Sequence, residues 1–215
     1  PGYIGGDSLR DLMLACVGAG IAFVITFIVS FVLYKDEEEE TVQAAPAVET
    51  GADSASASET KQAAGTASIS APVKGQLVPL AKVDDPTFAE EILGKGAAII
   101  PEDGNFVSPV KGKIQTVFDT KHAIGIVSDD GVEILIHVGL NTVNLKGEHY
   151  EALVKDGDAV EVGTPILKVD LKAVKAAGYD TITPVIITNT MDYGDVIAIA
   201  EGEVKSGETI IKVMG

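Results

Sequence analysis

The sequence contains one cysteine and no tryptophan, and aromatic residues make up only 5% of its 215 residues. With Cys16 alone, neither an internal disulfide nor a cysteine-based zinc site can form within one chain. This fits a reducing compartment. The shortage of aromatic side chains argues against an activity based on stacking of nucleic-acid bases.

Basic residues are also scarce, because 16 Lys and Arg stand against 32 Asp and Glu, for a net charge of −16 at pH 7. A protein that reads a phosphate backbone needs a basic surface, so we expect no nucleic-acid partner. An acidic surface instead favours basic protein partners.

Charged residues are absent from positions 12–34, which are mostly apolar. About 20 apolar residues cross a hydrocarbon core of about 30 Å, so we predict a transmembrane helix. The run is too long for a signal peptide and lacks a basic leader. Small residues, which let helices approach closely, recur there at every fourth position. They are Gly18, Ala22, Thr26 and Ser30. A lone anchor has no use for such a stripe, so we expect 1–35 to hold the final helix of a larger membrane transport domain, contacting lipid and other helices through 12–34. The alternative is a dimerising anchor.

The next segment, 36–70, opens with five consecutive acids and continues mainly in Ala, Ser, Thr, Glu and Gly without an aromatic residue. Such a composition buries too little apolar surface to offset the entropy of ordering. We predict a flexible, disordered linker.

Residues 71–215 consist of short β-branched runs bounded by glycine, and only 86–93 and 170–177 have a helical pattern. This predicts an all-β domain. The tetrapeptide Pro-Val-Lys-Gly at 72–75 returns at 109–112, and the pattern Val-x-x-Gly-x-x-Ile-x-Lys-Val that begins at Val160 returns at Val204. Repetition of both patterns favours a duplicated β-sandwich made of two similar halves.

A histidine stands in one of the predicted strands, 132–138. Alternation places Glu133, Leu135 and His137 on one face of this strand. A strand histidine is either a core imidazole with satisfied nitrogens or a reactive group held on a rigid element. Its position alone leaves both interpretations open.

The sequence has two further histidines. His149 lies in a polar stretch and is interpreted as a surface residue. His122 is separated from His137 by one predicted strand and turn, 123–131, and a hairpin of that length can place the two imidazoles side by side.

The segment 131–143, Gly-Val-Glu-Ile-Leu-Ile-His-Val-Gly-Leu-Asn-Thr-Val, resembles the active-site signature of the glucose-type enzyme IIA domain of the bacterial phosphoenolpyruvate-dependent sugar phosphotransferase system. The resemblance extends over 71–215 and includes Pro-Val-x-Gly near its start, Asp-Pro-Thr-Phe at 85–88 and Thr-Lys-His-Ala at 120–123. It implies a duplicated β-sandwich and a phosphotransferase.

The resemblance implies that His137 accepts the phosphoryl group, that His122 is its partner and that Thr120 orients a histidine. The chemistry is consistent, because a neutral imidazole can attack phosphorus and form a labile phosphohistidine. A hydrogen bond from His122 would spread the charge of a loose transition state. No cofactor is required, although Zn²⁺ could bind between His122 and His137.

The family docks its partners on an apolar patch around the histidines, which implies a set of contact residues here. They are Phe88, Asp85, Ile92, Phe118, Ile124, Val138 and Asn141. We expect Phe88 to be a surface aromatic residue rimmed by the Asp85 carboxylate, which suits a basic partner. Asn141 replaces the aspartate that many members carry.

A IIA domain that follows a membrane domain directly resembles the B-C-A order of transporters for β-glucosides, sucrose and trehalose. The implied partners are HPr as donor and the cysteine of an enzyme IIB domain as acceptor. The implied location is the bacterial cytoplasmic membrane, with 36–215 in the cytoplasm.

Two other functions are compatible with parts of the sequence. A membrane-tethered zinc hydrolase would need a third ligand besides the two histidines. A lipoyl or biotinyl carrier would need Lys172 as its acceptor, but that lysine falls in a predicted helix rather than at a hairpin tip.

Overall fold

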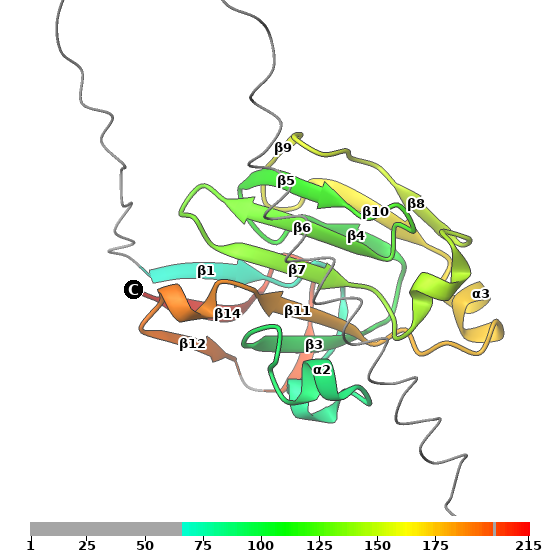
Figure 1. Ribbon diagram of the computed structural model, residues 1–215, viewed down its shortest axis with the longest axis horizontal. Helices are drawn as coiled ribbons and strands as arrows, with labels where there is room; N and C mark the ends of the chain where they lie inside the picture. The colour runs from blue at the N-terminus through cyan, green and yellow to red at the C-terminus, as the bar shows by residue number, and fades with distance from the viewer. Residues whose placement is uncertain (1–65, 200) are drawn as a thin grey trace, which may run out of the picture. The chain divides into compact units, whose positions relative to one another are not determined.

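The computed structural model describes residues 66–199 and 201–215 (Figure 1). The predicted helix at 12–34 and residues 36–65 of the predicted linker lie outside these ranges. Among the described residues, no helix is both long enough and apolar enough to cross a membrane.

One sheet of eight strands forms the larger layer of the fold. From edge to edge its strands are β13 (Gly202–Val204), β2 (Gly75–Val78), β3 (Gly96–Pro101), β11 (Thr183–Ile187), β7 (Glu133–His137), β6 (Ala123–Ser128), β5 (Gly112–Val117) and β9 (Ala159–Val160).

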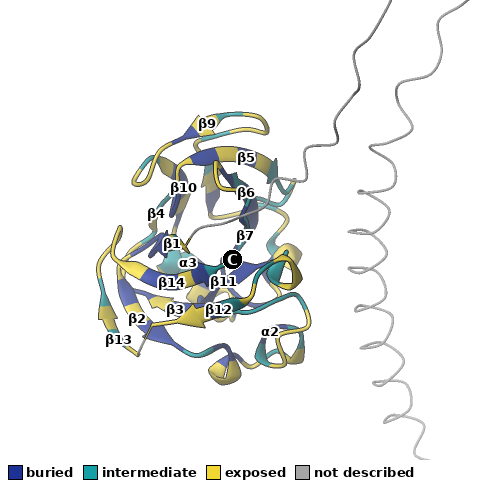
Figure 2. Cartoon of the chain, turned by 90° about the vertical axis from the view of Figure 1, so that its left-hand side faces the viewer, coloured by how far each residue is buried: buried dark blue, intermediate teal, exposed yellow. Residues whose placement is uncertain are grey.

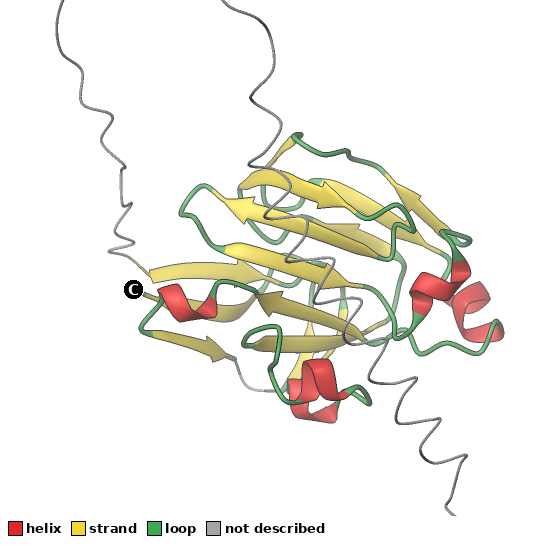
Figure 3. Ribbon diagram, viewed as in Figure 1, coloured by secondary structure: helices red, strands yellow, loops and turns green. Residues whose placement is uncertain are grey.

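Two three-stranded sheets complete the strand framework. One contains β1 (Thr66–Ser70), β14 (Thr209–Met214) and β12 (Asp195–Ala198), and the other contains β4 (Asn105–Val107), β10 (Pro165–Val169) and β8 (Tyr150–Ala152). The helices are short and lie outside the strands (Figure 3). They are η1 (Leu80–Lys82), α2 (Pro86–Ala89), η2 (Thr142–Leu145), α3 (Leu171–Ala176) and η3 (Thr190–Asp192). The all-β prediction is confirmed.

The strand order repeats from both edges of the large sheet, because β13-β2-β3-β11 on one side corresponds to β9-β5-β6-β7 on the other. The small sheets correspond in the same way, strand for strand. One half, 105–169, is continuous and lies in the chain between the two parts of the other half. This agrees with the predicted duplication.

The repeated tetrapeptides end on the first residues of β2 and β5, which hold corresponding places. A Cβ at Gly75 would lie 2.2 Å from the Ile100 carbonyl oxygen, and one at Gly112 would lie 2.1 Å from that of Val127. Real Cβ atoms do not approach so closely, so both strands must begin with glycine.

The main core lies between the large sheet and the two small ones, and Figure 2 shows buried positions along their strands. Ile134 and Ile136 of β7 enter it, together with Ile69 of β1 and Ile211 of β14. A smaller second cluster, which includes Leu80, packs on the other face of the large sheet under η1 and α2. The two faces of β7 therefore meet different clusters.

The long β2–β3 connection is what covers this outer face, because η1 and α2 both belong to it. The corresponding β5–β6 connection contains only 118–122. Helices therefore cover more of the outer face in the half that contains β2 and β3 than in the half that contains β5 and β6. His137 lies on β7, next to the boundary between the two halves.

Two expected boundaries differ from the structure. The predicted linker includes 66–70, but these residues form β1, which pairs antiparallel with β14. Ile69 is the only large apolar residue among them, so the local pattern is weak and the strand is specified by this distant partner. The helix expected over 86–93 ends at Ala89, because Glu90 leaves the helical conformation and Glu91 has a left-handed φ of 55°. The helix expected over 170–177 is confirmed as α3.

Candidate active site

His137 is the last residue of β7 and lies on its outer face, opposite Ala123 of β6. Neighbouring Ile136 and Val138 point into the main core, as strand alternation requires. The prediction that Glu133, Leu135 and His137 share a face is therefore confirmed. The imidazole is held at the end of a central strand that is paired on both sides.

Gly139, two residues after the end of β7, turns the chain with a left-handed φ of 82°. A Cβ at this position would lie 2.6 Å from the Thr142 methyl carbon and 2.7 Å from the Asp180 carbonyl oxygen. Both the conformation and the space therefore require glycine. The turn fixes the backbone that follows His137.

His122 lies in the turn between β5 and β6, immediately before β6. The preceding Lys121 has a left-handed φ of 55°, which directs the chain back into the sheet. The Thr120 hydroxyl and Nδ1 of His122 share a hydrogen bond of 2.5 Å. The Val138 amide donates to the His122 carbonyl at 2.7 Å. The hairpin thus places His122 next to His137, as the sequence predicted.

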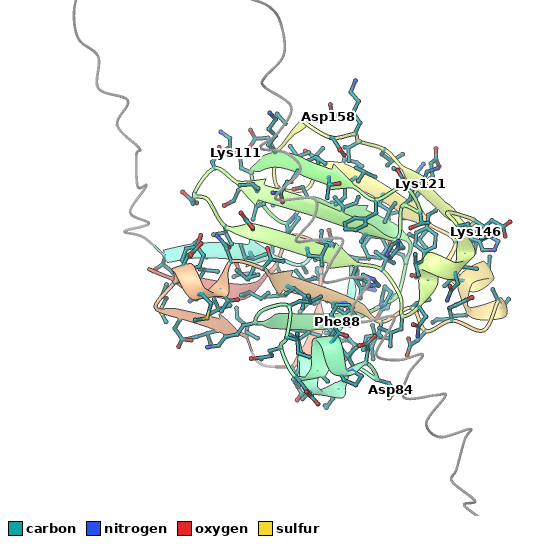
Figure 4. The ribbon with its side chains drawn as sticks, viewed as in Figure 1. Asp84, Phe88, Lys111, Lys121, Lys146 and Asp158 are labelled. Carbon is teal, nitrogen blue, oxygen red and sulfur yellow. The ribbon has the colours of Figure 1, made fainter. Side chains whose placement is uncertain are left out.

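The two imidazoles are in contact, with ring centroids 4.8 Å apart and planes at 81°. An aromatic ring supports each of them. Phe88 packs on His137 at 5.1 Å, and Phe118 packs on His122 at 5.7 Å. In Figure 4, Phe88 extends from α2 towards the large sheet. Packing on both sides restricts the orientation of the rings.

The two imidazoles differ in the surroundings of Nδ1. In His137, Nδ1 is buried and has no hydrogen-bond partner among the described residues. Nδ1 of His122 is instead bound to Thr120. The Nδ1 atoms of both rings are therefore enclosed by the protein or bonded to it.

Both imidazoles are neutral at pH 7. Burial, together with the neighbouring His137, lowers the pKa of His122 to about 3. Burial lowers the pKa of His137 to about 4, opposed by the backbone of Gly139 and of His137 itself. A neutral imidazole keeps a lone pair on one nitrogen, which nucleophilic attack requires.

These lowered pKa values predict a pH dependence of stability. Between pH 6.5 and 4 the unfolded chain binds protons at these histidines and the folded chain does not, so the free energy of unfolding falls as the pH drops below about 6.5. We expect the urea midpoint to be flat from pH 8 to 7 and to decrease from pH 6.5 to 5. The decrease should be smaller for His122→Gln. A wild-type midpoint that stays constant between pH 7 and 5 would contradict the expected burial.

The family model described as phosphoenolpyruvate-dependent sugar phosphotransferase system, EIIA 1, matches residues 67–193, which contain the whole histidine site. The chain belongs to this family. EIIA components are phosphotransferases with a phosphohistidine intermediate, and the contact between two neutral imidazoles suits that chemistry.

Curated relatives place the EIIA sequence in two contexts. The β-glucoside-specific EIIBCA component of Bacillus subtilis is 50% identical over 143 residues, which are 66% of this chain and 24% of that protein. The glucose-specific EIIA component of Halalkalibacterium halodurans is 49% identical over 150 residues, which are 68% of this chain and 87% of that protein. The chain thus spans about a quarter of the first relative and most of the second.

A solved structure supports the EIIA fold. The glucose permease IIA from Mycoplasma capricolum matches with a TM-score of 0.63 and 37% identity, covering 69% of this chain and 96% of that one. The histidine site is therefore built on the fold of a solved member of the family.

Two of the residues expected on the EIIA docking patch lie elsewhere. Ile124 and Val138 are each 1% exposed and belong to the main core, so the prediction that they form a surface patch is wrong. Each lies one position from the outer-face residues Ala123 and His137, and neighbouring strand residues point to opposite faces.

Of the other expected contact residues, Phe88 and Phe118 contact the imidazoles. Phe88 is only 5% exposed, because it packs on His137 and in the second cluster, so it is not the surface aromatic residue we expected. The Asp85 carboxylate caps α2 by accepting from the Thr87 amide at 2.8 Å. Ile92 and Asn141 are exposed, and Phe118 is half-buried against His122.

Two further apolar residues, on β7 and on η2, were not among the candidates. Leu135 is half-buried on the same face of β7 as His137. Val143 is 48% exposed on η2, in the segment that follows the Gly139 turn. The strand alternation already placed Leu135 beside His137, so a stricter use of it would have found this residue.

The alternative functions gain no support from the EIIA site. No group of three or more ligating side chains that could hold a metal occurs within 66–199 and 201–215. Lys172 lies in the first turn of α3, where a carrier domain would need a hairpin tip.

Proposed function

We propose that this chain transfers a phosphoryl group from phospho-HPr to Nε2 of His137 and then to the cysteine of an enzyme IIB domain, which passes it to a sugar during uptake. The observation that carries this proposal is the contact between two neutral imidazoles, in both of which Nδ1 is buried or bonded to the protein.

Nε2 of His137 is the proposed nucleophile because Nδ1 is buried. With the ring proton on Nδ1, the Nε2 lone pair attacks phosphorus in line and forms a P–N bond, while the P–N bond of the donor breaks. The resulting phosphohistidine retains its Nδ1 proton. Later attack by a thiolate returns the electron pair to Nε2.

His122 would stabilise the phosphoryl oxygens. We propose that the Thr120 hydroxyl donates to Nδ1 of His122, which leaves the ring proton on Nε2, next to the site of transfer. A dianionic phosphoryl group beside this ring would also favour its protonation. Thr120 would act through His122 rather than on the phosphoryl group.

We propose that a docking face surrounds the histidines and consists of Ile92, Phe118, Leu135 and Val143. Ile92 and Val143 are 54% and 48% exposed, and they lie on the α2 and η2 sides of the site. Exposed acids, among them Asp84 and Glu90, lie on the α2 side and would favour a basic partner. Figure 4 shows Asp84 near Phe88.

The docking face yields a prediction about affinity. Val143→Asp places a charge in the contact, so we expect kcat/KM for phosphorylation by phospho-HPr to fall about tenfold, mostly through KM. The control is Val162→Asp, since Val162 is similarly exposed, at 52%, but lies on the β9–β10 turn. Equal losses in the two variants would contradict a docking role for Val143.

The transfer needs no resident cofactor in this proposal. A Zn²⁺ ion at His122 and His137 would have to take its remaining ligands from water or from a partner, because no group of three or more ligating side chains forms among the described residues. Such an ion would compete with the phosphoryl group for the same nitrogens.

For the whole protein we propose a membrane transporter of the B-C-A order, with 12–34 as the last helix of its membrane domain and 36–215 in the cytoplasm of a bacterium. The uncharged run at 12–34 and the 50% identity to a β-glucoside-specific EIIBCA component support this arrangement. The relative's name suggests a β-glucoside as the sugar.

The direct test incubates the chain with radiolabelled phosphoenolpyruvate, enzyme I and HPr, and maps the label by peptide mass spectrometry. We expect an acid-labile, base-stable label on His137 that appears only when HPr is present. Label on another residue, or none, would overturn the proposal.

A further inference from the structure

The ring of Phe88 is held in place by the start of α2. The Asp85 carboxylate accepts from the Thr87 amide at 2.8 Å, and the Asp85 carbonyl accepts from the Phe88 amide at 3.1 Å. Pro86 opens the helix with a backbone angle that already suits it. The ring is 5% exposed and packs in the second cluster with Leu80. The capped helix and the cluster therefore fix where this ring lies.

The plane of the His137 imidazole depends on its neighbours. Rotation about χ2 of histidine has a broad, roughly two-fold preference, so the side chain alone does not fix the ring plane. Two rings pack on His137, that of Phe88 at 5.1 Å with planes at 56° and that of His122 at 4.8 Å with planes at 81°. Phe88 supplies the contact that comes from the other half of the sheet.

The ring plane matters for phosphoryl transfer because the lone pair of Nε2 lies in it. In-line attack needs this lone pair to point at phosphorus, and a misplacement of about 1 Å can cost about a hundredfold in rate. A residue that is 5% exposed offers a protein partner almost no surface, whereas Ile92, just after the same helix, is 54% exposed. Burial thus separates the task of Phe88 from docking.

We propose that Phe88 is a positioning residue whose ring holds the His137 imidazole in the plane from which Nε2 attacks phosphorus. This rests on the proposed transfer through Nε2 and names the residue that aims the nucleophile. The P–N bond forms at Nε2 while the P–N bond of the donor breaks, and Phe88 acts only through His137. Its loss should therefore lower the rate within the complex and not the affinity for the donor.

The test compares Phe88→Leu with wild type in the full chain, because leucine keeps an apolar side chain in the second cluster but lacks the flat ring. Labelling of His137 is followed by rapid quench over a range of phospho-HPr concentrations, which gives a maximal rate and a half-maximal concentration. We expect the maximal rate to fall about tenfold and the half-maximal concentration to stay within about twofold of wild type.

Two control variants separate positioning from docking and from loss of packing. Ile92→Ala removes an exposed side chain, so the half-maximal concentration should rise about threefold at a nearly unchanged maximal rate. Leu80→Ala removes a side chain that is 2% exposed in the same cluster as Phe88. It should lower the urea midpoint and leave the maximal rate near that of wild type.

Three results would overturn the positioning role. One is a raised half-maximal concentration with an unchanged maximal rate in Phe88→Leu, which would make Phe88 a docking residue. Another is an equal loss of maximal rate in Leu80→Ala, because any loosening of the cluster would then suffice. The third is wild-type kinetics in Phe88→Leu, and in that case this inference alone fails. If wild type takes up no label on His137, the proposed function fails as well.

Discussion

The His137→Ala chain is expected to take up no acid-labile phosphoryl label from phosphoenolpyruvate, enzyme I and HPr. Alanine has no lone pair to attack phosphorus, and the neighbouring His122 cannot substitute. Its Nδ1 is bound to Thr120, and in the tautomer proposed above its Nε2 carries the ring proton, so neither of its nitrogens offers a free lone pair. Label is measured by autoradiography after base treatment.

The control for this variant is His149→Ala, because His149 is exposed in the loop before β8. It should be labelled like wild type. A comparison of urea midpoints shows whether the His137→Ala domain is folded. Undiminished label in a folded His137→Ala chain would mean that another residue accepts the phosphoryl group.

The second large effect is expected in His122→Gln, and it should affect delivery rather than acceptance. Acceptance needs the lone pair of His137, and the glutamine amide still offers a hydrogen-bond donor beside it. Delivery needs charge stabilisation while the P–N bond to His137 stretches, and an amide cannot become positively charged as an imidazole can. We expect near-normal labelling by phospho-HPr and about a hundredfold slower transfer to a IIB domain.

Single-turnover chase of the labelled chain with an added IIB domain measures this effect. Thr120→Val supplies a graded comparison, since it leaves the His122 ring in place and removes the hydroxyl that bonds its Nδ1. Its delivery rate should lie between those of wild type and His122→Gln. Full onward transfer by His122→Gln would show that the second imidazole is not a charge stabiliser.

The part of the site that could be predicted from the sequence follows from the alternation of side chains between the two faces of β7. It placed Leu135 and His137 on one face and Val138 on the other, and the structure confirms this division. Val138 was expected in the patch through the family resemblance, but it lies on the face of β7 opposite to His137. The side of the sheet to which a strand residue points decides whether it can contact a partner.

Other features depend on contacts between distant parts of the chain. Phe88 has no local pattern that predicts its burial, which follows from packing on His137. The strand β1 likewise depends on pairing with β14. The hydrogen bond from Tyr150 to the Val138 carbonyl joins residues whose separation in the sequence gives no periodic signal. Local propensity cannot supply such information.

The pairing of β1 with β14 has a consequence for how this domain can be combined with others. Thr66 lies opposite Met214, so the first and last described strands run side by side, and in Figure 1 both chain ends of the domain lie away from the end of β7 that carries His137. Attachments at such adjacent ends disturb neither the core nor the access of proteins to the histidines. The domain can therefore be joined to other domains as a unit. This agrees with the relatives, because the matching region is about a quarter of one protein and most of another.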